Sequence, residues 1–187
     1  MKQKIAIITV ITLLAGLLAG CGCSIGGGDV VGKTESYLRD NDYEVRTESG
    51  EKDSRYDKEL YGQKFKYKKG KKPTYTNKAV TMQKAKYKKT TETDFKVTKK
   101  TYKKRKGIPF KYKKQELPKV NGYSGYIFTA INKKDKSYSC HVLAKKGDLL
   151  VIIINESKLK CKKKELRKKA QAANQENGKI YQEITSY

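Results

Sequence analysis

Residues 123–154 read YSGYIFTAINKKDKSYSCHVLAKKGDLLVIII, and they give the clearest indication of the fold class. Two polar turns, at 132–136 and 145–148, divide it into three runs rich in β-branched and aromatic residues. Runs of that composition between turn residues are typical of strands joined as hairpins. We predict an antiparallel meander. Its third strand, 149–154, is apolar on both faces, so we expect it to be central in the sheet or covered by a helix.

The segment after the meander can supply that cover. Residues 157–177 are rich in helix formers, Asn155 or Ser157 can cap the start, and Gly178 can end the helix. A narrow apolar stripe runs through this segment, formed by Leu159, Leu166, Ala170 and Ala173. A helix with such a stripe packs it on a sheet and leaves its lysines in water. Beyond it we expect residues 180–187 to be a last short strand or a tail.

The segment before the meander repeats one short motif. FKYKK at 65–69, AKYKK at 85–89 and FKYKK at 110–114 alternate an apolar or aromatic residue with lysine, and residues 94–102 alternate as well. A period of two predicts strands with one face in water. The fold class is therefore α+β, an antiparallel β-sheet covered by a C-terminal α-helix, with the Lys-rich domain spanning residues 64–187.

This order of elements resembles the small α+β modules of the PsbP-like kind and many uncharacterised lipoprotein domains. The resemblance covers the order of strands and helix, and it carries over no functional residue.

The N-terminus has the parts of a secretory signal. A basic start, Met1 to Lys4, precedes residues 5–18, which carry no charge. This apolar run is shorter than the ~20 residues that span a bilayer comfortably. Two alternatives remain open, an uncleaved membrane anchor and a first buried strand of a cytosolic α/β domain.

The end of this signal, Leu18-Ala19-Gly20-Cys21, resembles the lipobox of bacterial lipoproteins. The resemblance implies that the signal peptide, residues 1–20, is removed and that Cys21 carries a diacylglyceryl group. It implies a protein anchored by lipid at the extracytoplasmic face of the cell membrane. Residues 21–63 are glycine-rich and then acidic, with few apolar residues, so we expect a flexible tether with at most one short helix at 34–39.

A nucleotide-binding motif lies within this tether. Gly27, Gly32, Lys33 and Thr34 fit the phosphate-binding pattern G-x-x-x-x-G-K-[ST]. The pattern functions only between a strand and a helix, and a lipidated Cys21 leaves no room for that strand. We therefore interpret these residues as part of the tether, and a nucleotide-binding enzyme is the least favoured hypothesis.

Positive charge is the main feature of the composition. The chain has 44 Lys and Arg against 19 Asp and Glu, a net charge of +25, and residues 64–119 alone hold 22 basic and 3 acidic residues. Nearly all are lysines, which favour diffuse attraction to anions over base reading. The candidate residues for an anionic surface are Lys66, Lys68, Lys69, Lys86, Lys88, Lys89, Lys103, Lys104, Arg105, Lys111, Lys113 and Lys114.

The sequence offers little for catalysis or metal binding. Export would permit a Cys140–Cys161 disulfide, and the alternative is two separate thiols, one buried in a strand and one on a helix. His141 is the only histidine, so zinc ligands are too few, and we predict no metal and no cofactor. Cys140 and Ser139 are both expected to point away from His141, which we interpret as a satisfied strand histidine. No catalytic residue is predicted.

The resulting hypothesis is a non-enzymatic, lipid-anchored envelope protein whose basic surface binds anionic lipids or wall polymers, with no small-molecule substrate. An alternative is extracellular nucleic-acid binding, because tyrosines interleaved with lysines can stack on bases. A third interpretation is a compositional lysine bias that leaves only a solvated face.

Overall fold

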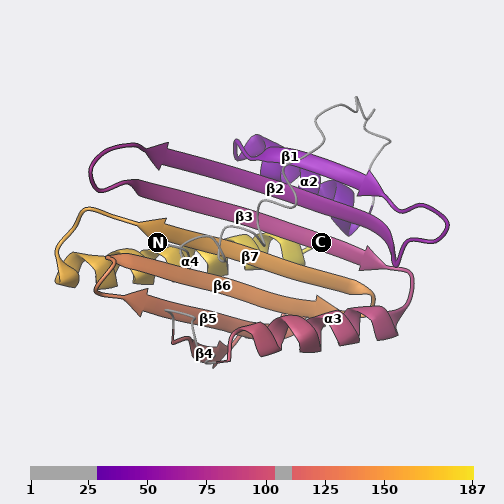
Figure 1. Cartoon of the computed structure of the whole chain (residues 1–187). Helices are drawn as coiled ribbons and strands as arrows, with labels where there is room; N and C mark the ends of the chain where they lie inside the picture. The colour runs from indigo at the N-terminus through magenta and orange to yellow at the C-terminus, as the bar shows by residue number, and fades with distance from the viewer. Residues whose placement is uncertain (1–28, 104–110) are drawn as a thin grey trace.

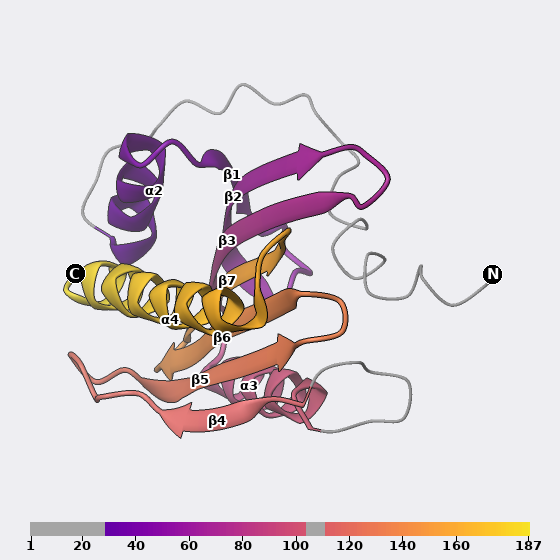
Figure 2. The same ribbon diagram turned by 90° about the vertical axis from the view of Figure 1, so that its left-hand side faces the viewer.

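The computed structural model describes residues 29–103 and 111–187, which build one antiparallel sheet with helices on both faces (Figure 1). The seven strands lie in the order β1-β2-β3-β7-β6-β5-β4. Figure 2 shows helices α2 and α4 on one side of the sheet and α3 on the other. The α+β architecture with a C-terminal covering helix is therefore confirmed. The strand bounds are β1 Glu44–Ser49, β2 Tyr56–Lys68, β3 Thr74–Ala85, β4 Lys113–Glu116, β5 Ser124–Asn132, β6 Ser137–Lys146 and β7 Leu149–Lys158.

The predicted meander is present as β5, β6 and β7. Asn132 pairs with Ser137 across the first turn, and Lys146 pairs with Leu149 across the second. Lys136 and Gly147 take positive φ values of 52° and 55° in these turns, the left-handed conformation that tight hairpins require. Strand β7 is central, between β3 and β6, and both of its faces are covered. This is the position that its continuous apolar sequence predicts.

The C-terminal helix exists, but its predicted bounds were wrong. Helix α4 spans Lys163–Thr185, so Ser157 still belongs to β7 and Gly178 lies inside the helix. The strand continues because β3 pairs with it as far as Tyr75 and Lys158. The helix continues past Gly178 because the apolar stripe continues, and Ile180, Tyr181 and Ile184 are buried against the sheet. Residues 180–185 are thus helix and not the strand or tail that we expected.

The alternation at 94–102 was misleading. Residues Lys88–Thr101 form helix α3, whose buried residues are Thr91 and Phe95, one helical turn apart. Thr91 donates a hydrogen bond to the carbonyl of Asp148 at 2.8 Å, and Phe95 packs with Leu143 and Leu150. Of the three repeats, 65–69 begins within β2, 85–89 straddles the end of β3 and the start of α3, and 110–114 lies partly outside the described residues.

Residues 30–63, which we expected to be mostly mobile, are part of the domain. Helix α2, Val30–Asp40, and strands β1 and β2 occupy this segment. A few apolar side chains suffice, because Val31 and Leu38 lie in the same buried cluster as Leu60. Gly62 permits the close approach, since a Cβ there would lie 2.8 Å from Leu38 Cδ1. Residues 1–28, which include the predicted signal peptide and Cys21, lie outside the described residues.

Candidate functional site

The residues of the phosphate-binding pattern do not form a loop where the structure describes them. Gly32, Lys33 and Thr34 lie in α2, whose N-cap Asp29 accepts a hydrogen bond from the Gly32 amide at 2.6 Å. The Thr34 hydroxyl is buried and donates to the carbonyl of Val30 at 2.7 Å, so it does not point toward solvent where a metal ion could bind. Gly27 lies outside the described residues.

Cys140 and Cys161 are separate thiols in this structure, so the disulfide that export would permit is not formed. Cys140 is buried in β6, where burial raises its pKa to about 12. A thiol with a pKa this high is a poor nucleophile at neutral pH. Cys161 is not on a helix, because it lies in the connection between β7 and α4, where it packs against the cluster that contains Cys140.

The predicted anion-binding residues do not form one patch. Lys66, Lys68 and Lys69 lie at the β2–β3 hairpin, whereas Lys86, Lys88 and Lys89 lie at the opposite end of β3. A third group, Lys111, Lys113 and Lys114, lies at or beside edge strand β4, and Lys103 follows α3. Lys104 and Arg105 are outside the described residues. The similarity of the three repeats in sequence therefore does not bring them together in space.

A different set of lysines is brought together by the sheet. Three connections meet at one end of the sheet, residues 69–73, 133–136 and 159–162, and we call them the basic end (Figure 1). The strand register places them there, because Tyr75 and Ser137 both pair with Lys158, and the Leu159 amide donates to the carbonyl of Lys136 at 3.0 Å. These connections carry eight lysines and one carboxylate, Asp135.

The opposite end of the sheet has no such excess. Its connections, residues 50–55, 86–87, 117–123 and 147–148, carry four basic residues and three carboxylates. The charge of the chain is therefore concentrated by the topology as well as by the composition. Such an asymmetry raises the local concentration of anions at one end of the molecule.

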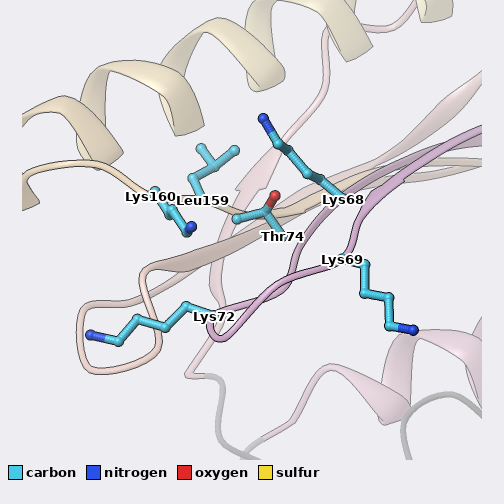
Figure 3. Close-up of a pocket in the computed structure, with 6 residues that line it drawn as sticks. All are labelled: Lys68, Lys69, Lys72, Thr74, Leu159 and Lys160. Carbon is cyan, nitrogen blue, oxygen red and sulfur yellow. The ribbon is translucent and has the colours of Figure 1, made fainter.

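A shallow pocket of about 200 Å³ lies at the basic end (Figure 3). The side chains of Lys68 and Lys160 lie on either side of Thr74 and Leu159, while Lys69 points away from Lys68. None of the four lysines that line the pocket forms an ion pair within residues 29–103 and 111–187. The pocket is smaller than the roughly 300–1,000 Å³ of sites that enclose small molecules. Unpaired ammonium groups around a shallow surface fit an extended anion better than a small molecule that must be enclosed. Its lining residues are Lys68, Lys69, Lys72, Thr74, Leu159 and Lys160.

Sequence reasoning found Lys68 and Lys69 of this site and missed Lys72, Lys160 and Thr74. The missed lysines lie in connections and not in the repeated motif. Alternate connections of an antiparallel meander leave the sheet at the same end, and that is the one sequence signal that would have grouped them.

A second polar constellation surrounds His141 on the face that α3 covers. Nε2 of His141 lies 2.8 Å from Glu156 Oε1 and 2.8 Å from Ser139 Oγ. Ser139 donates to the same carboxylate oxygen at 2.7 Å. The prediction that Ser139 points away from His141 was wrong, because the two residues are two apart in β6 and so share a face. Glu156 of β7 reaches both because it pairs with Ser139 of the neighbouring strand β6.

Two tyrosines complete this His141 cluster. Tyr102, at the end of α3, lies with its hydroxyl 3.0 Å from Nδ1 of His141, and the Tyr112 hydroxyl is 2.9 Å from Ser139 Oγ. Burial raises the pKa of Tyr112 to about 12 and raises that of Tyr102 as well, so both hydroxyls remain protonated. The cluster thus links β6, β7, the end of α3 and the segment before β4.

The hydrogen-bond arrangement of the His141 cluster differs from that of a nucleophilic serine site. In such a site the carboxylate accepts from one imidazole nitrogen and the serine donates to the other. Here Glu156 and Ser139 both lie at Nε2, and the serine proton points to the carboxylate. Burial by itself would raise the pKa of Glu156, but the hydrogen bonds from His141 and Ser139 and the electrostatic interaction with His141 outweigh it and lower that pKa. The carboxylate therefore serves to satisfy buried donors.

Within the described ranges no group of three or more His, Cys, Asp or Glu side chains is arranged to hold a metal ion. In the same part of the chain no helix is both long and apolar enough to cross a membrane. Comparisons with protein-family models, curated proteins and solved structures found no match to the chain.

Proposed function

We propose that this chain is a non-enzymatic envelope protein, held at the extracytoplasmic face of the cell membrane by a lipid on Cys21, that binds anionic envelope components through its basic end. The observation that carries the binding proposal is the convergence of three lysine-rich connections beside a pocket whose lysines have no carboxylate partner in the described residues. Elsewhere in the domain lysines do find such partners, as Lys78 does with Glu176 and Lys145 with Glu92.

The size and form of the site favour a polymer or a surface over a small molecule. Each lysine close to an anionic membrane surface contributes about 1 kcal/mol, so several acting together give appreciable affinity. A lipid anchor would hold the domain near phosphate-bearing polymers and headgroups, where weak individual contacts add.

The binding proposal is tested by neutralising lysines at two places. The variant K69Q/K72Q/K160Q removes three lysines of the basic end, and K88Q/K89Q/K96Q removes three exposed lysines of α3. We expect the first to weaken polyphosphate binding by the full-length, detergent-solubilised protein on the order of 100-fold, at about 1 kcal/mol per lysine. We expect the second to change it little. Fluorescence titration at about 50 and 200 mM salt would check this, because contacts with ammonium groups are salt-sensitive.

Equal losses in the two variants would mean that net charge alone attracts the polymer, and the basic end would then have no special role. Binding of neutral dextran as tightly as polyphosphate would contradict the proposal altogether.

The anchoring proposal has its own measurement, the intact mass of the protein from the membrane fraction with peptide mapping of its N-terminus. We expect a chain that begins at Cys21 and carries a diacylglyceryl group. A chain that retains residues 1–20 without lipid would contradict the lipobox interpretation and would reopen the cytosolic alternatives.

A further inference from the structure

One part of the sheet face that α3 covers is left open within the described residues. Helix α3 packs on β3, β6 and β7, with Phe95 beside Leu143 and Leu150. The halves of β2 and β3 nearest the basic end lie beyond it (Figure 1). Phe65 and Tyr67 of β2 are 58% and 59% exposed there. Large aromatic side chains this exposed, side by side, are unusual on a protein that has no partner for them.

Phe65 and Tyr67 have an aromatic neighbour in β3, which is Tyr75. Tyr67 lies directly opposite Tyr75 of β3, and the rings of Phe65 and Tyr75 stack with centroids 6.5 Å apart and planes 27° apart. Residues 65 and 67 point to the face opposite Leu60 and Gly62, which lie under α2, because side chains alternate along a strand. We call Phe65, Tyr67 and Tyr75 the aromatic platform.

The platform is continuous with the basic end. Lys158 is the β7 neighbour of Tyr75, and Lys69, which lines the pocket, follows β2 directly and points away from Lys68 (Figure 3). The backbone positions of Lys158 and Tyr75 are thus one strand spacing apart, and Lys69 follows Tyr67 by two residues. A ligand that runs along this edge of the sheet would meet both rings and lysines.

We propose that the aromatic platform binds the sugar rings of an anionic glycan whose carboxylate or phosphate groups are held by the lysines of the basic end. The proposal rests on the anion binding proposed above and names the ligand class. An aromatic ring has a negative face and a positive edge, so the C–H face of a sugar ring packs favourably on it. Gln63, whose Nε2 donates to Oδ1 of buried Asn77 at 2.9 Å, lies partly exposed at the border of the platform.

Two other ligands fit these observations less well. A membrane would require apolar side chains at the protruding turn, and residues 69–73 carry lysines, Gly70 and Pro73 but no aromatic or aliphatic residue that could insert. Single-stranded nucleic acid could stack on the rings. However, the cationic groups at the basic end are all lysines, without the arginine fork that combines stacking with phosphate binding.

The test compares two polyanions on the full-length protein in detergent. Polygalacturonate carries sugar rings and charges, and polyphosphate carries charges alone. We expect F65A/Y67A to weaken polygalacturonate binding roughly tenfold and to leave polyphosphate binding unchanged. Y87A is the matched control, since Tyr87 is 71% exposed near the start of α3, at the other end of the sheet. It should alter neither affinity.

The outcomes separate this inference from the proposed function. If wild type binds both polymers and F65A/Y67A binds both as tightly, the basic end binds anions but the platform has no role. Equal losses for both polymers would equally overturn the assignment to sugar rings. If F65A/Y67A instead selectively loses tight binding of poly(dT), the platform stacks bases and the glycan assignment is wrong. If wild type binds neither polyanion, the proposed function itself fails.

Discussion

Replacing Glu156 by alanine should lower the free energy of unfolding by about 3 kcal/mol or more, the largest effect that we expect from a single polar substitution. The carboxylate accepts hydrogen bonds from His141 and Ser139, and both donors are buried. Leaving a buried donor without its acceptor costs about 1–3 kcal/mol, and here two donors lose the same acceptor without regaining water. Urea unfolding followed by circular dichroism would measure the change.

A matched control is Glu165→Ala. Glu165 pairs with Lys169 at 3.7 Å on α4, but its side chain is 51% exposed and water replaces the lost partner. We expect a cost below about 1 kcal/mol, as for other surface pairs. Equal effects of the two substitutions would mean that the His141 cluster does not stabilise the fold.

The same carboxylate makes part of the stability depend on pH. The pKa of Glu156 is lower in the folded chain than its ordinary value of 4.5, so below that value the unfolded state binds more protons. The contribution is therefore complete above about pH 4.5 and is lost as the pH falls through the folded pKa. The difference in unfolding free energy between wild type and Glu156→Gln should shrink between neutral pH and that acidic range.

Replacing Gly125 by alanine should destabilise the sheet by about 3 kcal/mol, at the upper end of overpacking costs. A Cβ at this position would lie 2.1 Å from the carbonyl oxygen of Leu143 and 2.6 Å from Cα of Ala144. Both contacts are backbone atoms of β6, which pairs with β5 and with central β7, so no side-chain rotation relieves the overlap. The strands must move apart, and thermal or urea unfolding would record the loss.

Replacing Gly178 by alanine should change the free energy of unfolding in the opposite direction. A Cβ there meets no atom within 4 Å, and the residue lies inside α4. Alanine is a better helix former than glycine, so Gly178→Ala should stabilise the protein by about 0.5–1 kcal/mol. A destabilising effect of Gly178→Ala would indicate that α4 ends near this residue, as the sequence alone had suggested.

The distribution of lysine bears on whether the basic character has a function. A compositional bias would spread lysines over all solvated faces, and many lysines of this chain are spread in that way, among them Lys88, Lys89 and Lys96 on α3. The excess in three connections at one end, against nearly balanced charge at the other, is not explained by composition alone. The paired lysine variants distinguish these two explanations.

The strands of the meander and the turns that separate them could be predicted from the amino-acid pattern alone. Residues 149–154 could only be a buried strand, because a run apolar on both faces must be covered on both. Leu166, Ala170 and Ala173 likewise determined a helix that packs on the sheet, although not where it ends. The helix cannot start at Ser157 because Ser157 pairs with β3, and it continues past Gly178 because Ile180 and Ile184 are buried against the sheet. Both reasons are tertiary contacts.

Which residues act together depends on contacts between segments that are far apart in the sequence. The alternation at 94–102 predicts a strand, yet the buried site for Phe95 beside Leu143 and Leu150 selects a helix. The acidic segment 34–63 has too few apolar residues to predict order from its sequence. Burial of Leu38 and Leu60 in one apolar cluster nevertheless stabilises its helix and strands. Neither the basic end nor the His141 cluster is contiguous in sequence. Both exist because antiparallel pairing aligns the connections at one end of the sheet and places Ser139 opposite Glu156.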